Sequence, residues 1–338
     1  MSLVASTPAS RTRFSPMRGS VLAWLAFAVV VAFAVSLLVG PAGFGWPASD
    51  AAAARLILTE IRLPRAILGA LIGGALGLSG AVLQGYLRNP LAEPGLIGIS
   101  GGASRGAVAA IHSGLASTFA LALPLGGLAG AVVATVAVMA LAGAGSGPIT
   151  LILAGVAVSS VAGALTSLAL NLSPNPFASV EMLFWMMGSL GDRSLSHVWL
   201  AAPMIAAGSA LLIATGRSLD GLSLGEDAAR NLGVDLRRLR QIVVAGTALS
   251  VGAATSVAGT IGFVGLVVPH LLRPLVGHQP SRLLWASLLG GAALTLAADI
   301  ALRLISPAGD VRLGVLTALV GAPFFLWLVI GSRHEIGP

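Results

Sequence analysis

The stretch that decides the fold runs from residue 62 to residue 104 and reads RLPRAILGALIGGALGLSGAVLQGYLRNPLAEPGLIGISGGAS. Its first part, 66–87, is apolar over the roughly 20 residues that a helix needs to cross a bilayer. Pro90, Glu93 and Pro94 then interrupt the apolar run, which resumes at Gly95. Proline restricts its own backbone and that of the residue before it, so the first helix must end here. The stretch therefore predicts two membrane helices joined by a broken segment.

The composition of the whole chain agrees with a membrane setting. Of its 338 residues, 56% are hydrophobic and 9% are charged, and the mean hydropathy is +0.95, which excludes a soluble domain. All 19 basic residues are arginine, and the missing lysine excludes a phosphate-binding G-x-x-x-x-G-K-[ST] loop and a Schiff base. The chain has no cysteine, so thiolate metal sites and disulfides are excluded as well. The net charge of +7 comes from arginines that border apolar runs, which favours membrane flanks over nucleic acid.

Ten apolar stretches are predicted to span the membrane. They are 21–39, 66–87, 95–112, 119–142, 149–170, 196–215, 242–258, 260–276, 283–304 and 313–331. The seventh and eighth are short and closely joined, so nine or eleven spans remain alternatives. The segment 177–190 is predicted to form an additional helix at the interface, with Trp185 at headgroup depth.

The arginines predict the orientation of these spans. Residues 1–20 are polar and basic, and the run that starts at Val21 exceeds the roughly 7–15 residues of a signal-peptide core. We therefore expect a retained first span with a cytoplasmic tail. With that tail inside, the inner arginines are Arg11, Arg13, Arg18, Arg88, Arg217, Arg230, Arg237, Arg238, Arg240, Arg273, Arg282 and Arg333. The outer ones are Arg55, Arg62, Arg65, Arg193, Arg303 and Arg312. This bias favours two cytoplasmic termini, with 332–338 as the C-terminal tail.

Small residues recur every fourth position in the second span, at Gly69, Gly73, Gly77, Ala81 and Gly85. Such a stripe lets a second helix backbone approach closely, so we expect ordinary helix packing. A role in lining a transport pathway is the alternative.

The longest polar excursion, 216–241, reads GRSLDGLSLGEDAARNLGVDLRRLRQ and is predicted to hold two short helices broken at Gly233. Glu226 and Asp227 fall in the first turn of one helix, where carboxylates suit the positive helix end. The spacing from Asp227 to Gly233 is close to the E-A-A-x-x-x-G loop by which permeases of ATP-binding-cassette (ABC) importers hold their ATPases. The alternative is a solvated basic loop that only sets topology.

Four blocks together resemble the FecCD/BtuC family of type II ABC importer permeases: 62–104, 224–240, 259–277 and 298–328. The resemblance implies an all-α polytopic fold of about ten helices in one transmembrane domain, 21–331, within a bacterial inner membrane. It implies a homodimer with two ATPase subunits, which carry the ATP and Mg, and a periplasmic binding protein. We expect no enzyme activity, no bound cofactor, no metal site and no nucleic-acid partner. The expected substrate is an iron complex, either siderophore or haem, with cobalamin as the alternative.

The resemblance also assigns roles to particular residues. The residues expected to dock the binding protein are Arg62, Arg65 and Arg303. The residues expected to couple to the ATPase are Gly225, Glu226, Asp227, Ala228, Ala229, Leu232 and Gly233, followed by helical 234–240. The candidates for the pathway and its re-entry segment are Asn89, Pro90, Glu93, Pro94, Gly95, Ser100 and Arg105. Arg105 falls within a span, so it either faces the pathway or extends its side chain toward an interface.

Two other functional classes are weighed against the permease. Gly98 to Gly101 spells the G-x-S-G motif of rhomboid proteases, with Ser100 as nucleophile and His112 or His270 as base. Rhomboids usually have six or seven spans, however, and His270 fits a structural role better. An ion-coupled secondary transporter would need acids at the membrane centre, whereas Glu181 and Asp299 are expected near the outer boundary.

Overall fold

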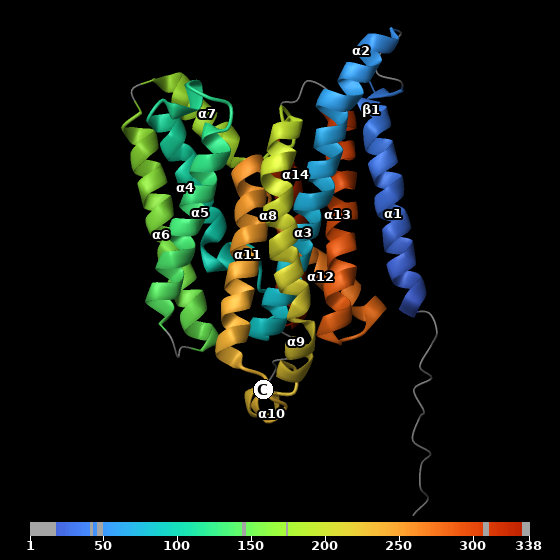
Figure 1. Ribbon diagram of the computed structural model, residues 1–338, viewed down its shortest axis with the longest axis vertical. Coiled ribbons are helices and arrows are strands. Elements are labelled where there is room, and N and C mark those ends of the chain that lie inside the picture. Colours follow the sequence, from blue (N-terminus) through green and yellow to red (C-terminus); the bar gives the residue numbers. More distant parts are fainter. Residues whose placement is uncertain are drawn as a thin grey trace, which may run out of the picture.

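The computed structural model describes residues 18–40, 43–45, 50–143, 147–173, 175–306 and 311–332 as a bundle of helices (Figure 1). The first half comprises α1 (Arg18–Leu38), α2 (Ala51–Leu56), the π-helical η1 (Ile57–Arg62), α3 (Leu63–Leu87), the 3₁₀ turn η2 (Pro94–Ile97), α4 (Ile99–His112), η3 (Leu115–Ser117), α5 (Ala122–Ala142) and α6 (Pro148–Asn171). The second half comprises α7 (Pro176–Met186), α8 (Leu195–Ala214), α9 (Gly216–Leu222), α10 (Glu226–Asn231), α11 (Leu236–Ala258), α12 (Val264–Val276), α13 (Pro280–Ile305) and α14 (Leu313–Ser332). A two-stranded hairpin, β1 (Val39–Gly40) with β2 (Gly43–Phe44), follows α1. Residues 1–17 and 333–338, which hold most of the predicted tails, lie outside the described residues.

The predicted all-α fold with about ten spans is confirmed. Within the described residues, seven helical stretches are long and apolar enough to cross a membrane. Two shorter apolar helices, α12 and α14, and the 14-residue α4 account for the other predicted spans. The helices α2, η1 and α3 run on as one helical stretch from Ala51 to Leu87, so the helix that contains the second span begins well before the predicted residue 66.

One expectation about local structure needs correction, and one burial was not foreseen. The expected second short helix of the polar loop is the first turn and a half of α11, which continues from Leu236 directly into the span. The segment 177–190 does form a helix, α7, and its Trp185 is buried against α4 residues such as Val108, so protein surrounds this ring. Apolar content alone could not separate burial in protein from exposure to lipid at this position.

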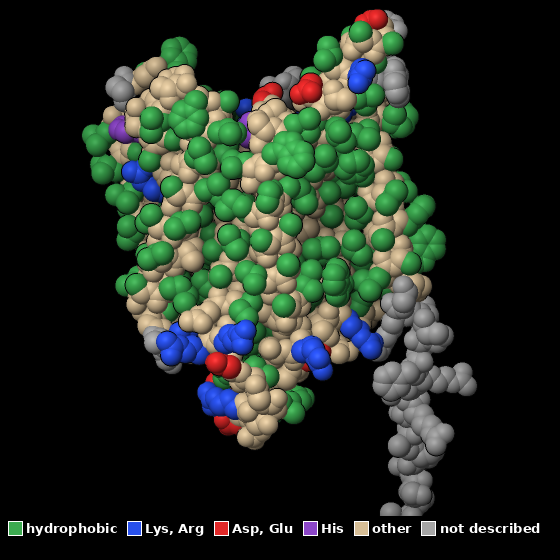
Figure 2. All heavy atoms as spheres, in the orientation of Figure 1, with side chains coloured by type: hydrophobic (Ala, Val, Ile, Leu, Met, Phe, Trp, Pro, Cys, Tyr) green, Lys and Arg blue, Asp and Glu red, His purple; other side chains and the backbone are tan. Residues whose placement is uncertain are grey.

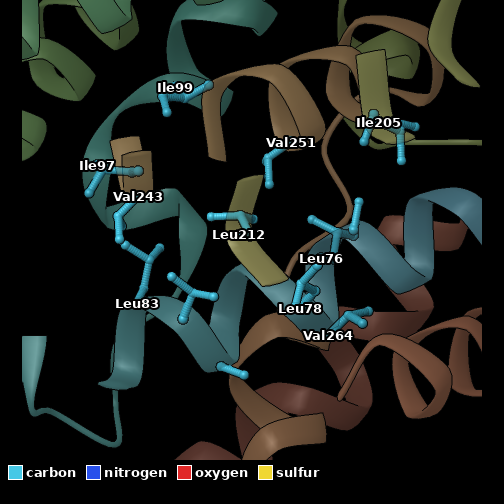
Figure 3. Packing of buried hydrophobic residues seen from close by; sticks show 14 of the residues in the cluster. Leu76, Leu78, Leu83, Ile97, Ile99, Ile205, Leu212, Val243, Val251 and Val264 are labelled. Atoms are coloured by element: carbon cyan, nitrogen blue, oxygen red, sulfur yellow. The ribbon is translucent and has the colours of Figure 1, made fainter. Parts of the chain in front are cut away.

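The centre of the bundle is α3, which packs along α13, α12, α11 and α8. Its apolar window is 83% buried, whereas that of α1 at the periphery is 6% buried. Figure 3 shows Leu76, Leu78 and Leu83 of α3 pointing toward Leu212, Val243 and Val264 of the surrounding helices. Helices far apart in the sequence therefore enclose one shared core.

The predicted glycine stripe does serve close helix packing. A Cβ added to Gly77 would lie 2.2 Å from the carbonyl oxygen of Ser287, and one added to Gly73 would lie 2.3 Å from that of Gly291. Both contacts join α3 to α13, and a larger side chain would force the two backbones apart.

Candidate docking surfaces and pathway elements

The polar loop 216–241 lies at one end of the bundle, which we call the loop end (Figure 1). Its backbone turns at Gly225 and Gly233, whose φ angles of 106° and 81° disfavour residues with a side chain. Between them α10 starts with Glu226 and Asp227 in its first turn and ends with Arg230 in its last, as the helix dipole favours. The short helix is therefore specified locally by its own sequence.

The polar surface of α10 is exposed. Arg230 lies 3.1 Å from the Asp227 carboxylate and 3.3 Å from that of Glu226, while Arg88 reaches Glu226 at 3.7 Å. Two leucines of the loop, Leu224 and Leu232, are 69% and 65% exposed. Figure 2 shows arginine and acidic side chains gathered at this end of the molecule. Exposed leucines among exposed charged side chains are a combination suited to a protein partner.

Asp220 anchors this surface to the membrane bundle. Its carboxylate accepts hydrogen bonds from the backbone N–H of Ser281, at 2.8 Å, and from the Gln279 side chain, at 3.0 Å. These contacts join α9 to the N-terminus of α13. On the other side of the loop, Asp235 caps α11 by accepting from the N–H groups of Arg237 and Arg238. A cleft of about 860 Å³ lies between these anchors and is lined by both α9 and α11.

The predicted coupling residues are therefore brought together in one place. Gly225 through Ala229 form the start of α10, and Leu232 and Gly233 form the turn that follows. Ala229 is fully buried in the main hydrophobic core and so packs α10 against the bundle, while its carbonyl oxygen accepts from the N–H of Val234 and closes the turn after α10. The remaining residues present the outer surface of the loop.

The broken segment of the opening stretch starts at the loop end and returns into the bundle. Arg88 ends α3 with a φ of 49°, and the Asn89 side chain accepts from the N–H of Leu91. Pro90 is exposed, whereas Pro94 is buried. The contact between Arg88 and Glu226 places the start of this segment next to the polar loop.

Two breaks in the helical structure meet where this segment enters the bundle. A Cβ added to Gly265, at the start of α12, would lie 2.7 Å from Cδ of Pro94. The Glu93 carboxylate interacts with the backbone N–H of Phe263, whose φ of 65° marks the turn before α12. A Cβ on Gly95 would itself lie 3.3 Å from the Glu93 carboxylate. Non-helical backbone within a membrane protein is tolerated where protein covers it, and here the two breaks cover each other.

The end opposite the loop holds a buried ion cluster. Arg65 donates to both oxygens of Asp299 at 2.8–3.1 Å, and Arg303 reaches the same carboxylate at 2.9 Å. Asp299 is 1% exposed and Arg303 is 6% exposed. Arg303 also donates to the carbonyl oxygens of Ser36 and Val39, at 2.9 and 2.6 Å. The cluster therefore joins α1, α3 and α13.

Arg62 is held in the same region and is only 8% exposed. It donates to the carbonyl oxygens of Leu37, at 2.8 Å, and Gly45, at 3.2 Å. Among the three arginines expected to dock a binding protein, Arg65 keeps the most exposed side chain, at 21%. The docking role of all three stays a prediction, and the geometry favours Arg65 as the member that a partner can reach.

Two further arginines lie at this end, and sequence reasoning used them only for topology. The guanidinium carbon of Arg312 lies 4.9 Å from the ring centroid of Phe184. Arg193 lies in the turn before α8, and burial lowers its pKa, as does the positive charge of Arg312, while Asp192 acts in the opposite direction. Their spacing of more than a hundred residues offers no sequence signal that they meet. Figure 2 shows this end hollowed between two lobes, one formed by α4 to α7 and the other by α2 and α3.

The remaining candidates are separated by the fold. Ser100 begins α4 and His112 ends it, so they lie about 18 Å apart along the helix and form no dyad. His270 of α12 packs edge-on against Phe324, with ring centroids 5.7 Å apart, as its structural role predicts. Arg105 lies at the middle of α4 and enters a groove between α4, α5 and α6. In the part of the chain that the structure describes, no three His, Asp or Glu side chains cluster as metal ligands.

Comparison with known proteins matches residues 21–331 to the FecCD transport family. The cobalamin import system permease protein BtuC of Halobacterium salinarum is 40% identical over 328 residues, covering 96% of this chain and 84% of that protein. The vitamin B12 import system permease proteins BtuC of Klebsiella pneumoniae and Citrobacter koseri are 39% and 38% identical over 315 residues, covering 92% of this chain and 94% and 95% of theirs. A metal-chelate type ABC transporter solved in an inward-facing conformation has a TM-score of 0.84 at 32% identity, covering 93% of this chain and 99% of that one.

Proposed function

The chain belongs to the FecCD transport family, and from that premise we propose that it is the permease subunit of an ATP-driven cobalamin importer. It is a multi-pass membrane protein of an ABC permease family, and its own chain supplies transport architecture instead of chemistry. We place it in a bacterial cytoplasmic membrane with both termini inside, as the arginine distribution favours. The rhomboid and ion-coupled alternatives are set aside because the family match covers nearly the whole chain.

Identity of 38–40% to permeases named for cobalamin or vitamin B12, over more than nine tenths of this chain, is the observation that carries the substrate assignment. The iron complex expected first from sequence is therefore replaced by the alternative, cobalamin. The metal-chelate transporter, which shares the fold at lower identity, keeps iron complexes as the second candidate.

The loop end is proposed as the ATPase-docking surface. Its support is the combination of a short exposed helix, two exposed leucines and firm anchoring by Asp220 and Ala229. Movement of an ATPase bound here would pass to α13 through Asp220 and to α11 through Asp235. The proposed complex contains two copies of this chain and two ATPase subunits, and ATP and Mg belong to the ATPase.

The opposite end is proposed to receive the binding protein. Arg65 would meet a carboxylate of that partner, with Arg193 and Arg312 as further cations at the same end. Arg62 and Arg303 act below it by holding α1, α3 and α13 together. Guanidinium groups that are fixed in this way suit bidentate contact with carboxylates and electrostatic steering.

The test is transport by reconstituted vesicles that contain the permease and its ATPase, with the binding protein added outside. We expect ATP-dependent uptake of cobalamin that requires both partners, and much weaker uptake of ferric siderophore or haem. Uptake of an iron complex in preference to cobalamin would overturn the substrate assignment while leaving the importer intact. Uptake that needs neither ATP nor a partner would overturn the importer itself.

A further inference from the structure

Arg105 is the charged side chain that the proposed transport machinery leaves unexplained. It lies at the middle of α4, seven residues before the end of that helix at His112. Its Nε and Nη1 atoms are buried and have no hydrogen-bond partner, and none of the ion pairs among the described residues includes it. A cation in a membrane span is costly and needs an anionic or polar partner.

The side chain enters an apolar groove of about 480 Å³ between α4, α5 and α6. Val133 and Ala137 of α5 form one wall, and Val161 and Leu165 of α6 form the other. Val133 and Val161 are largely exposed, so the groove opens on the surface of the described bundle. The groove therefore combines one cationic side chain with apolar walls that an acyl chain can contact.

The depth of Arg105 suits a group at the membrane surface. Seven residues of helix correspond to about 10 Å, and an arginine side chain can extend toward the interface over most of that distance. The glycine contacts agree with this level: Gly106 packs against Gly126 and Gly102 against Gly130, which lie in the first nine residues of α5. The guanidinium thus lies within about 10 Å of the end of α4 that is opposite the loop end, where we expect the headgroups of that leaflet.

A second copy packed on this face through α5, α6 or α14 would offer no carboxylate to this cation. The sequences of α5, α6 and α14 contain no aspartate or glutamate, so a copy packed on this face through these helices would bring no carboxylate to Arg105. The anion that a bilayer supplies at this depth is the lipid phosphate, together with its acyl chains.

We propose that the groove between α4, α5 and α6 is a binding site for one anionic phospholipid, with its phosphate on Arg105 and an acyl chain along Val133, Ala137 and Val161. The inference depends on the membrane setting alone and holds whichever substrate the importer carries. Charge complementarity selects the headgroup, and the apolar walls select a lipid over a free anion.

The site can be tested by native mass spectrometry of the full chain in detergent, titrated with phosphatidylglycerol or with phosphatidylcholine. The wild type should retain one tightly held phosphatidylglycerol in preference to phosphatidylcholine. Arg105→Gln should weaken this binding about tenfold, as expected for loss of a charge-assisted hydrogen bond, whereas Arg105→Lys should keep part of it. Ala137→Phe should also reduce binding by filling the groove while the charge remains. Arg55→Gln, at an exposed position of α2, is the matched control and should bind as the wild type does.

Equal phosphatidylglycerol retention by Arg105→Gln and the wild type would overturn the proposal. Displacement of the lipid by inorganic phosphate at the same concentration would assign the site to a free anion instead. Loss of a chain dimer in Arg105→Gln, with lipid retention unchanged, would assign the groove to a second copy.

Discussion

The two ends of the bundle use the same chemistry for different purposes. At the loop end Arg230 contacts Glu226 and Asp227, and the Asp227 side chain is 95% exposed. At the opposite end Arg65 and Arg303 contact Asp299, which is buried together with Arg303. An exposed pair contributes little to folding because water screens it, whereas removing one partner of a buried cluster leaves an uncompensated charge. Burial thus decides whether an arginine builds the protein or remains available to a partner.

This contrast changes how arginines at the far end are interpreted. Motif position assigns Arg62, Arg65 and Arg303 one shared docking role, but their surroundings divide them. Arg62 and Arg303 satisfy the carbonyl oxygens at the end of α1 and in the hairpin that follows, where the chain leaves the helix. Of the three, only Arg65 combines an ion pair with a partly exposed side chain.

The largest effect is expected from the carboxylate at the centre of the buried cluster. Asp299→Ala would leave Arg303 buried without its counter-ion and should reduce the free energy of unfolding by about 3–5 kcal/mol. Denaturant unfolding of the full chain in detergent micelles measures this change. Asp227→Ala, the exposed counterpart, should change the same quantity by less than about 0.5 kcal/mol. Equal effects of the two substitutions would remove the distinction between the ends.

The second effect concerns association instead of folding. Replacing Leu224 and Leu232 with serine should weaken ATPase binding by about a hundredfold, because few apolar anchors carry most of an interface. The free energy of unfolding should stay close to that of the wild type, since both side chains are already exposed. Leu304→Ser, an exposed leucine near the other end, is the control and should bind the ATPase normally. Undiminished ATPase binding by the double variant would exclude this surface.

Much of the fold could be predicted because the bilayer limits the possibilities. Apolar runs of the required length mark the spans, and Pro90 and Pro94 mark the break between α3 and α4. The beginnings of α3 and α11 were missed because both helices extend past the apolar region. The burial of Trp185 was not predicted because an apolar residue looks the same in sequence whether protein or lipid surrounds it.

The candidate sites were less predictable because they depend on contacts between distant residues. The loop motif is local, so its residues were found together in α10 and the turn after it. The cluster around Asp299 joins residues more than 200 positions apart, and nothing in the sequence pairs Arg65 with that acid. Arg193 and Arg312 are likewise distant in sequence, and only the folded structure shows that their charges interact.

A third, intermediate effect is expected for the acid that anchors the loop end. Asp220→Ala removes the acceptor for the Ser281 N–H and the Gln279 side chain, so the free energy of unfolding should fall by about 1–2 kcal/mol. The site is only partly buried, which is why its loss should cost less than the loss of Asp299. Asp220→Asn retains one acceptor oxygen and should recover part of the stability. A reduction in the free energy of unfolding as large as that of Asp299→Ala would mean that the contacts of Asp220 belong to the structural core of the protein.

The smallest effect is expected at the surface of α10 itself. Arg230→Gln removes both helical ion pairs, yet exposed pairs at these spacings contribute only about 0.3–0.5 kcal/mol each, so unfolding should change by less than about 1 kcal/mol. The contribution should shrink further in high salt, because the charges are screened there. If the affinity for the ATPase falls while the free energy of unfolding stays the same, Arg230 contributes to partner binding and not to stability. A stability loss well above 1 kcal/mol that disappears in high salt would show that α10 is held by its ion pairs and not by Ala229 and Asp220.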